Sequence, residues 1–533
     1  MGLDLEPDAI ARFRLPDRGH CGAGVAGDHV RLLGWLPQPL GGGGGKGKGQ
    51  TQGLASGNGF AACLGRPSRS KRRANRNPNN REDAMTVPQP TAADLSADIA
   101  RVFAAQQAHQ WDVKASTAAE RKAKLARLKA AVEAHADAIV AAVLEDTRKP
   151  EGEIRVTEVL NVIGNVQRNI DNLDAWMTPT EVVPSLNPAD RAQIIYEARG
   201  VCLILGPWNF PLGLTFGPVA AAIAAGNCCM VKLTDLCPAT ARIAAMIIRE
   251  AFDENEVALF EGDVSVAEAL LALPFNHIFF TGSTRVGKIV ATAAAKNLAS
   301  VTLELGGKSP VIIDQGADID KIAADLANAK QFNCGQACSC PDYVFVPEGE
   351  KDRLVEGFRA NVAKNLYGEG GAINKGAIAQ VVNRANFIRV KGLFDDAVAQ
   401  GATVAVGGVL EEDDLTVHPT MLTGVTPQMK ILQEEIFAPL LPVMTYDSLD
   451  SAIGYIEAHD KPLALYIYSN DEANVEKILG RTSSGGVTVN GVFSHYLENG
   501  LPFGGVNHSG TGSYHGYFGF KAFSHERAVY RHR

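Results

Sequence analysis

Two patterns of hydrophobic and polar residues follow each other along the chain. From Ala92 to Val143, apolar side chains recur on one face of a helical repeat, and Thr117 with Glu120 has the spacing of a helix-capping box. From Val201 onward, short apolar runs without polar alternation are separated by amphipathic runs. Such runs predict strands buried on both faces and crossover helices between them. We therefore expect an α/β protein built on a doubly wound parallel sheet.

The predicted elements form two series. The first has strands at Val201–Leu205, Cys228–Lys232, Ala258–Gly262, His277–Gly282 and Val301–Leu305, with helices at Gly217–Ala225, Ala239–Phe252, Val264–Leu273 and Ser283–Asn297. The second begins after Ile313, with helices at Ile319–Phe332, Glu350–Leu366 and Ala385–Gln400 and strands at Thr403–Val406, Leu463–Tyr468 and Gly486–Val489. This second series predicts another α/β domain. The last 40 residues are rich in Gly, His and aromatic residues and predict a loop with a final packed extension.

The first 84 residues differ from the rest. They contain 17 glycines and 13 Lys and Arg against 7 Asp and Glu, and a basic run ends at Arg76. Such a segment has too little bulky apolar surface to form a core. A nucleic-acid tail and a targeting sequence are two interpretations, although early acidic residues count against an organellar presequence. We favour a third, in which translation begins at Met85 and the leader is an upstream artefact.

Composition narrows the class of the remaining chain. The formal net charge is −8, so the residues after the basic leader carry −14, which argues against a nucleic-acid-binding body. Nine cysteines without a disulfide-framework spacing indicate a reducing cytoplasm. The stretch Gly200–Val231 has no charge, but three prolines and five glycines interrupt it. It predicts a buried strand, turn, helix and strand, and no membrane span.

One glycine-containing turn is a candidate anion site. The sequence Phe280–Gly287 lies between a predicted strand and a predicted helix, where backbone N–H groups can approach a phosphate. Its two glycines are spaced G-x-x-x-x-G, which differs from the dinucleotide fingerprint and lacks the Walker Lys-Ser/Thr pair. Alone, this signal is weak, and a tight turn without a ligand is the default interpretation of a lone glycine pair.

Glu304 is a carboxylate within an apolar strand, beside Gly306 and Gly307. Charged groups are seldom buried without a partner or a task, and burial raises a carboxyl pKa toward the range of a general base. The alternative is a structural hydrogen bond to backbone amides.

Three cysteines, Cys334, Cys338 and Cys340, lie within seven residues. No second Cys or His cluster has zinc spacing, so we expect no metal. Cys338 follows a Gly-Gln turn at the end of a predicted helix, which suits a nucleophilic thiol. Its neighbours are bystanders or redox partners.

Two further positions follow buried strands. Prolines fix the loop Gly206–Pro211, so that the amide of Asn209 could donate to a developing oxyanion. Lys232 ends the next strand and Asp235 follows it, which fits the ribose and phosphate of a nucleotide. The alternative for this second pair is a surface ion pair.

Together these motifs resemble the aldehyde dehydrogenase superfamily in order and spacing. The resemblance extends over residues 95–533, and its remaining motifs are Glu434–Pro439 and Leu501–Gly505. The tail Asn507–Gly516, with Asn490–Tyr496, is most similar to the class 3 branch and its coniferyl aldehyde dehydrogenases.

The resemblance implies a role for each matching residue. Cys338 would be the nucleophile, Glu304 the general base and Asn209 the oxyanion donor. Lys232 and Asp235 would contact the adenosine ribose, and Glu435 and Phe437 would position the nicotinamide. The pyrophosphate would lie near Gly282, Ser283, Thr284, Arg285, Val286 and Gly287. The implied cofactor is NAD, with NADP as a second candidate, and the implied substrate is an aldehyde such as coniferaldehyde.

Four parts are expected: the leader 1–84, the helices and dinucleotide-binding domain 85–305, the catalytic domain 306–492 and an oligomerisation extension 493–533 of a homodimer. Three departures from the family pattern stand out. Asp235 replaces the usual glutamate, extra thiols surround Cys338, and Ala438 replaces a glycine. Rival interpretations are a CoA-acylating or reductive relative, which would not need Glu304 to activate water, and a catalytically silent binding protein.

Overall fold

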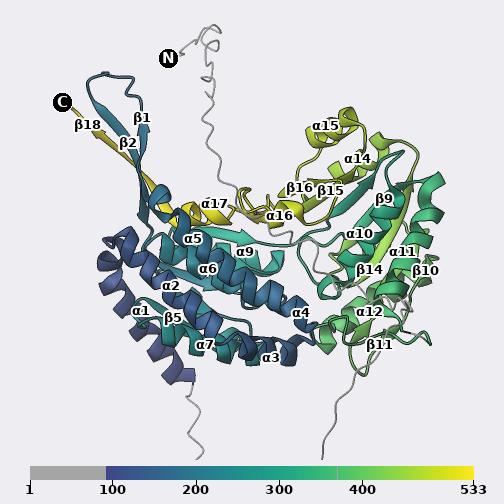
Figure 1. Ribbon diagram of the computed structural model, residues 1–533, viewed down its shortest axis with the longest axis horizontal. Helices are drawn as coiled ribbons and strands as arrows, with labels where there is room; N and C mark the ends of the chain where they lie inside the picture. Colours follow the sequence, from purple (N-terminus) through teal and green to yellow (C-terminus); the bar gives the residue numbers. More distant parts are fainter. Residues whose placement is uncertain (1–91, 369) are drawn as a thin grey trace, which may run out of the picture. The chain divides into compact units, whose positions relative to one another are not determined.

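The computed structural model describes residues 92–368 and 370–533 (Figure 1). The predicted leader, with its basic run and the proposed start at Met85, lies outside the described residues. The described chain has two large sheets covered by helices, and a smaller sheet that joins segments from the two halves of the chain.

The first large sheet has six strands in the order β17-β7-β6-β3-β4-β5. Five of them are parallel, and only β17 pairs antiparallel, with β7. The strands are β3 Val201–Leu205, β4 Cys228–Lys232, β5 Val257–Phe260, β6 His277–Thr281, β7 Ser300–Glu304 and β17 Gly510–Thr511. The five strands expected from the first series are therefore present, with ends that differ by at most two residues.

Helices cover both faces of this sheet, which confirms the predicted doubly wound α/β class. They include α6 Gly213–Ala224, α7 Pro238–Ala251, α8 Val264–Leu271 and α9 Thr284–Ala295. Along β3, Cys202 and Ile204 pack into one apolar cluster, and Val201, Leu203 and Leu205 pack into another. Because successive side chains of a strand point to opposite faces, an uninterrupted apolar run is what a sheet buried on both sides requires.

The predicted start of α6 at Gly217 was wrong by four residues. The helix begins at Gly213, because the carboxylate of Glu158 accepts hydrogen bonds from the N–H groups of Leu212 and Gly213, at 3.0 and 2.8 Å. An anion at this end satisfies donors that the helix itself leaves free. Glu158 is distant in sequence, so the local pattern could not reveal it.

A layer of helices precedes the sheet. It contains α1 Ala92–Lys114, α2 Ala118–Ala134, α3 Ala136–Thr147, α4 Glu151–Ile154, a π-helical segment Arg155–Leu160 and α5 Asn161–Met177. The predicted capping box is present: the hydroxyl of Thr117 accepts from the Glu120 N–H at 3.3 Å, and the Glu120 carboxylate accepts from the Thr117 N–H at 2.7 Å. Leu125, Leu128 and Val132 are fully buried on the inner face of α2.

The second large sheet has seven strands in the order β10-β13-β14-β9-β8-β15-β16. They are β8 Pro310–Ile313, β9 Tyr343–Pro347, β10 Thr403–Val406, β13 Thr420–Thr423, β14 Leu440–Tyr446, β15 Ala464–Tyr468 and β16 Gly486–Val489. The strands are parallel except at the edge, where β10 is antiparallel to β13. Of these seven strands, β10, β15 and β16 were predicted from the sequence, and β8, β9, β13 and β14 were not.

The second sheet also has helices on both faces. They are α10 Ile319–Gln331, α11 Lys351–Leu366, α12 Arg384–Ala399, α13 Lys430–Gln433, α14 Leu449–Glu457 and α15 Glu472–Arg481, with 3₁₀ turns at Phe332–Gly335 and Glu348–Glu350. Along β9, Phe345 faces the cluster that includes α12, and Val344 and Val346 face the cluster that includes α10 and α11. A short hairpin of β11 Leu410–Glu411 and β12 Thr416–Val417 lies apart from the sheet.

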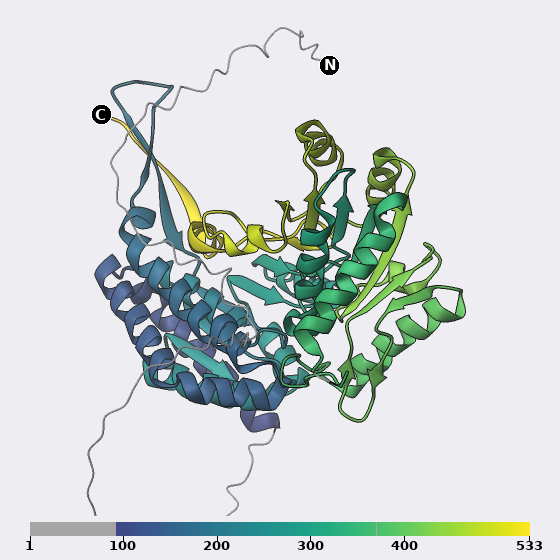
Figure 2. The ribbon, with the colours of Figure 1, turned by 45° about the vertical axis from the view of Figure 1, so that its right-hand side comes forward.

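The smaller sheet consists of β1 Thr180–Val182, β2 Arg191–Ala198 and β18 Ser524–Arg531. Figures 1 and 2 show it extending away from the larger sheets. Before β18, the chain passes through α16 Ser494–Leu497 and α17 Gly516–Ala522. Phe503, Tyr514, Phe520 and Phe523 are buried in the core of the first sheet, so the C-terminal segment packs into that core.

The charge-free stretch Gly200–Val231 contains β3, α6 and most of β4, as its prolines and glycines predicted. In the described part of the chain, no helix is both long and apolar enough to cross a membrane. Nor do residues 92–368 and 370–533 contain three His, Cys, Asp or Glu side chains grouped closely enough to hold a metal ion.

Candidate active site

Cys338 lies in a loop with unusual backbone geometry. Asn333, Cys334 and Gly335 all have positive φ angles, of 44°, 54° and 68°. A Cβ on Gly335 would lie 2.5 Å from the carbonyl oxygen of Ala438, so only glycine fits there. The loop leaves Cys338 partly exposed, whereas Cys334 and Cys340 are buried, with 0% and 5% exposure. Of these three thiols, Cys338 is the one that a substrate can reach.

Glu304 is the last residue of β7 and is 3% exposed. Neither of its carboxylate oxygens has a hydrogen-bond partner among the described residues, so the structural hydrogen bond considered as an alternative is not observed. Burial raises the pKa of Glu304 well above its ordinary value. A buried carboxyl without a partner is suited to accept a proton from a reacting group.

Cys338 and Glu304 are electrostatic neighbours. Burial, followed by the charges of Glu435 and Glu304, raises the pKa of Cys338 to about 12. Burial and the charges of Tyr496, Glu304 and Cys338 raise the pKa of Tyr514 in the same way. The thiol and the carboxyls therefore favour their neutral forms here, and a cation bound beside them would favour ionisation of the thiol.

Asn209 connects the first sheet to the cysteine loop. It follows β3 and is 5% exposed, and its side-chain amide donates to the carbonyl of Gln336 at 3.1 Å. Asn333 donates from its own amide to the carbonyls of Asn209 and Gln336, at 2.9 and 3.1 Å. A primary amide has two N–H donors, so Asn209 keeps a second one for an oxyanion.

The residues predicted to lie near the pyrophosphate follow the carboxyl end of β6. The hydroxyl of Ser283 caps α9 by accepting from the N–H of Val286 at 3.4 Å. A Cβ on Gly282 would lie 2.5 Å from the ring of Phe280, and one on Gly287 would lie 2.7 Å from Leu305. These glycines keep the turn and helix close to the sheet, where the first N–H groups of α9 can meet a phosphate. Thr284, Arg285 and Val286 form the first turn of the same helix.

Lys232 and Asp235 have different environments. Lys232 ends β4, is 6% exposed and donates from Nζ to the carbonyl of Leu233 at 2.9 Å. Asp235 is exposed in the turn that follows. Burial lowers the pKa of Lys232, and the charge of Asp235 opposes this shift. The two residues do not form a direct surface ion pair.

Glu435 lies close to the chain that leaves the general-base candidate, and Phe437 lies against Trp208. A Cβ on Gly306 would lie 2.3 Å from the carboxylate oxygens of Glu435, which places this carboxyl against the chain that leaves Glu304. Its Oε1 has no hydrogen-bond partner in the described chain, and burial, followed by the charge of Asp342, raises its pKa to about 8. Phe437 has a φ of 50° and meets Trp208 edge to face, with ring centroids 5.3 Å apart. An unpaired buried oxygen of this kind fits a hydroxyl of a bound dinucleotide.

Several residues that support the site were not predicted from the sequence. Lys149 and Glu158 form a buried ion pair beneath the Asn209 loop, and Tyr496 and Tyr514 surround Cys338. Asn333 and Gln336 lie in a motif that was recognised, but their roles were not assigned. Lys149 and Glu158 lie in the charge-rich segment 145–158, where nothing in the sequence distinguishes them from their charged neighbours.

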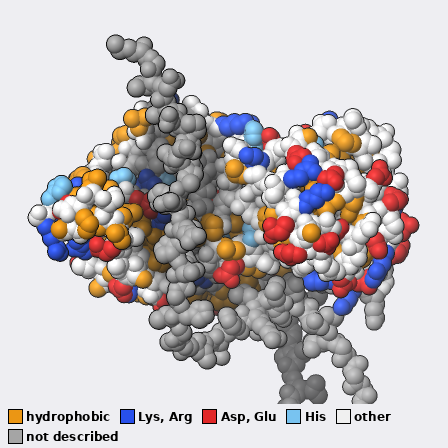
Figure 3. Space-filling model, turned by 90° about the horizontal axis from the view of Figure 1, so that it is seen from above, with side chains coloured by type: hydrophobic (Ala, Val, Ile, Leu, Met, Phe, Trp, Pro, Cys, Tyr) orange, Lys and Arg blue, Asp and Glu red, His pale blue; other side chains and the backbone are white. Residues whose placement is uncertain are grey.

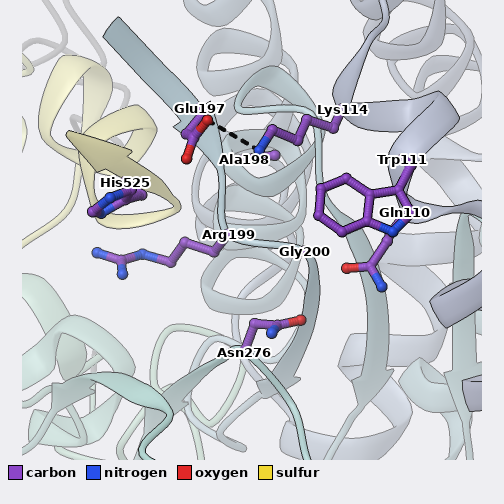
Figure 4. Close-up of a pocket in the computed structure, with 9 residues that line it drawn as sticks. All are labelled: Gln110, Trp111, Lys114, Glu197, Ala198, Arg199, Gly200, Asn276 and His525. Atoms are coloured by element: carbon purple, nitrogen blue, oxygen red, sulfur yellow. Dashed lines mark ion pairs between the residues drawn. The ribbon is translucent and has the colours of Figure 1, made fainter. Parts of the chain in front are cut away.

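A separate pocket of about 320 Å³ lies away from this site (Figure 4). It is lined by Gln110, Trp111, Lys114, Glu197, Ala198, Arg199, Gly200, Asn276 and His525. Gly200 and Asn276 precede β3 and β6, whereas Asn209 and Gly282 follow the same strands. The pocket therefore lies at the amino ends of these strands, and the candidate active site lies at their carboxyl ends.

Comparison with known proteins defines the class. The model described as "Aldehyde dehydrogenase family" matches residues 66–529. The chain is 49% identical to the "Putative aldehyde dehydrogenase AldX" of Bacillus subtilis, over 81% of this chain and 97% of that protein. It is 42% identical to the "Probable coniferyl aldehyde dehydrogenase" of Caulobacter vibrioides, over 74% of this chain and 82% of that protein.

Comparison of the structure with solved structures gives the same class of protein. The substrate-bound state of AldH from Staphylococcus aureus matches with a TM-score of 0.78 and 35% identity, over 82% of this chain and 94% of that one. Similarity to aldehyde dehydrogenase family 3 member A2 of Pongo abelii, at 40% identity over 73% of this chain and 79% of that protein, confirms the predicted class 3 resemblance.

The chain belongs to the aldehyde dehydrogenase family. It is accordingly an oxidoreductase that acts on the aldehyde group with NAD(P), as the resemblance implied.

Proposed function

We propose that this chain oxidises its aldehyde at Cys338, with Asn209 as oxyanion donor and Glu304 as the base that activates water. The observation that carries this proposal is the proximity of a partly exposed thiol to a buried carboxyl without a hydrogen-bond partner. Such a carboxyl has no structural hydrogen bond that would explain its burial, and it can take up a proton from a reacting group.

The proposed reaction has two halves. In the first, Cys338 loses its thiol proton to solvent and its sulfur bonds to the aldehyde carbon, while the free N–H of Asn209 donates to the oxyanion that forms. NAD(P), when bound, accepts the hydride that leaves this carbon. In the second, Glu304 takes a proton from water, whose oxygen attacks the resulting thioester. The C–S bond breaks, the carboxylic acid leaves, and the proton held by Glu304 passes to the sulfur, which restores both groups.

We propose that the dinucleotide lies along the carboxyl ends of β4, β6 and β7. Lys232 and Asp235 would hold the adenosine ribose, Gly282–Gly287 the pyrophosphate, and Glu435 and Phe437 the nicotinamide side. The capped start of α9 and the unpaired Oε1 of Glu435 support this assignment. Because the Asp235 carboxylate would repel a 2′-phosphate, we propose NAD as the better cofactor.

An aromatic aldehyde is the proposed substrate class. A series of aromatic rings begins beside Asn209: Phe210 stacks on Phe332 with centroids 5.5 Å apart, and Phe332 contacts Phe493 at 5.8 Å. Flat aromatic surfaces favour a ring-containing ligand. The coniferyl aldehyde dehydrogenase relative from Caulobacter vibrioides supports coniferaldehyde as the first compound to test.

The test compares kcat/KM for coniferaldehyde and for a straight-chain aldehyde of similar size. We expect coniferaldehyde to be the better substrate, and Phe493→Leu to reduce this preference by about tenfold. Phe518→Leu, at a half-buried ring on α17, is the control and should leave it unchanged. A preference for the straight-chain aldehyde in the parent enzyme would contradict the proposed substrate class.

We also propose that the protein is a cytoplasmic homodimer with parts at 85–305, 306–492 and 493–533. Seven cysteines in the described residues are free thiols, which suits a reducing compartment. Between β1 and β2, Val183 and Leu186 are 91% and 83% exposed, which supports burial against a second copy. Light scattering of Val183→Asp/Leu186→Asp should report a monomer where the parent protein is a dimer.

We propose no nucleic-acid or membrane partner. On the face seen in Figure 3, acidic and basic side chains are intermixed over the right-hand part, and neither sign dominates there. The backbone of a nucleic acid requires a concentrated basic surface.

A further inference from the structure

Lys149 and Glu158 form an ion pair that is sealed from solvent. Both side chains are 0% exposed, and Lys149 Nζ lies 3.0 Å from Glu158 Oε1. Removing two charges from water is costly, and a buried pair often adds little to stability compared with apolar residues of similar size. The remaining contacts of the two charged groups therefore indicate what the pair does.

Both charged groups hold the same short loop after β3. Lys149 Nζ donates to the carbonyl of Asn209 at 2.9 Å and lies 4.2 Å from the centroid of the Phe210 ring. Glu158 accepts the N–H groups of Leu212 and Gly213 through its second oxygen. The loop is thus held by a cation at its beginning and by an anion at its end.

The peptide carbonyl of Asn209 is held from two sides. Besides Lys149, the side chain of Asn333 donates to it at 2.9 Å, from the loop that carries Cys338. The carbonyl oxygen therefore accepts two hydrogen bonds, while the side-chain amide donates to Gln336. Main chain and side chain of Asn209 are fixed together, which fixes the direction of its remaining N–H.

The segment that carries Glu158 departs from regular α-helical geometry. Glu158 lies in the π-helical segment Arg155–Leu160, a conformation common at functional sites. This segment approaches α6 so closely that a Cβ on Gly213 would lie 2.6 Å from the carbonyl oxygen of Thr157. The close approach is what lets the Glu158 carboxylate reach the start of α6.

We propose that the Lys149–Glu158 pair is a positioning device that keeps the Asn209 amide aimed at the oxyanion. The inference rests on the proposed function, in which Asn209 is the oxyanion donor. Lys149 does not touch the reacting atoms and acts through the carbonyl of Asn209. An error of about 1 Å in the placement of such a group can cost about 100-fold in rate.

The test is a double-mutant cycle on the rate of the first NADH burst, measured with saturating NAD and aldehyde. Lys149→Met should slow the burst by about 10- to 100-fold and change the KM for NAD less than about twofold. In an Asn209→Ala background, which keeps the peptide carbonyl and removes the amide, Lys149→Met should slow it less than about threefold further. A full additional loss in that background would overturn the proposal.

Stability is separated from positioning by two further variants. Lys149→Met/Glu158→Gln leaves no unpaired buried charge, so its melting temperature should exceed that of Lys149→Met while its burst stays slow. If the burst rate recovers fully in this double variant together with the melting temperature, the pair has only a structural role. If Lys149→Met does not fold, this double variant enters the cycle in its place.

Arg121→Met is the matched control, because Arg121 is a buried cation, 5% exposed, that donates to the carbonyl of Ala224 at 3.1 Å away from the site. It should lower the melting temperature without slowing the burst.

The outcomes distinguish a failure of the proposed function of Asn209 from a failure of the proposed positioning role of the Lys149–Glu158 pair. If Asn209→Ala alone leaves the burst unchanged, the proposed function of Asn209 is wrong. If Asn209→Ala slows the burst and Lys149→Met does not, only the positioning role is wrong.

Discussion

The side-chain amide of Asn209 donates a hydrogen bond to the backbone carbonyl of Gln336, 3.1 Å away. Asn209 follows a strand of the first sheet, and Gln336 lies two residues before Cys338, in the part of the chain that forms the second sheet. This contact connects the two sheets at the point where the chemistry is proposed. The proposed oxyanion donor and the loop of the proposed nucleophile are therefore held by one polar network, and its disturbance should affect the rate before it affects the fold.

The three clustered thiols should respond differently to substitution. Cys338→Ala should lower turnover by at least about 10⁴-fold, because no covalent intermediate can form. Cys334→Ala and Cys340→Ser should keep most of the activity and cost about 1 kcal/mol of stability, since both thiols are buried and donate to backbone carbonyls. Steady-state kinetics with thermal melting checks this prediction. A major loss of turnover in Cys340→Ser would mean that Cys338 has been wrongly assigned as the sole nucleophile.

Glu304→Gln should separate hydride transfer from hydrolysis. Glutamine keeps the shape of the side chain but cannot accept a proton from water. Rapid mixing should show a burst of NADH followed by turnover slowed by about 100-fold or more, with the acyl group retained on Cys338 in the mass spectrum. If the burst and the trapped acyl group are both absent, Glu304 acts earlier, on the thiol.

Stability should fall as the pH rises through the titration of Glu435. The pKa of this carboxyl is raised to about 8, so at intermediate pH the folded chain keeps a proton that the unfolded chain has released. Stability is then greatest below the unfolded pKa and declines up to about pH 8. Glu435→Gln should flatten the decline only in part, because burial also raises the pKa of Glu153 to about 7. Melting temperatures of both proteins across this range test the prediction, and identical slopes would contradict it.

Cofactor preference should depend on Asp235. The parent protein should favour NAD over NADP modestly, because Asp235 is exposed and Lys232 beside it would attract a 2′-phosphate. Asp235→Ala should shift the ratio of kcat/KM values toward NADP by about tenfold. The exposed Asp253→Ala, in a different loop, is the control and should not shift it. An unchanged ratio in Asp235→Ala would remove this residue from the ribose site.

Much of the fold could be predicted from the sequence, because local pattern and tertiary role agree there. The apolar runs of β3 and β4 contain no polar residue except the final Lys232, and buried parallel strands require this. The smaller sheet could not be found in this way. Strand β2 is only partly buried and pairs with β18, which lies near the other end of the chain.

The residues of the site divide in the same way, into those that local motifs indicate and those that only tertiary contacts reveal. Cys338, Glu304 and Asn209 lie in short motifs whose residue types already indicate a reaction. Lys149 and Glu158 could not be identified in this way, because their importance comes from contacts with residues more than fifty positions away. Charged side chains are usually solvated, and only burial distinguishes this pair from the other charges of segment 145–158.

The most direct test of the proposed reaction is the rate of NADH formation from coniferaldehyde, measured with and without CoA and with identification of the product. Glu304 as a water-activating base predicts rapid NADH formation that does not depend on CoA, with the free carboxylic acid as product. NADH formation that requires CoA and yields a thioester would contradict the proposed hydrolysis, and no NADH in either condition would contradict the proposed oxidation.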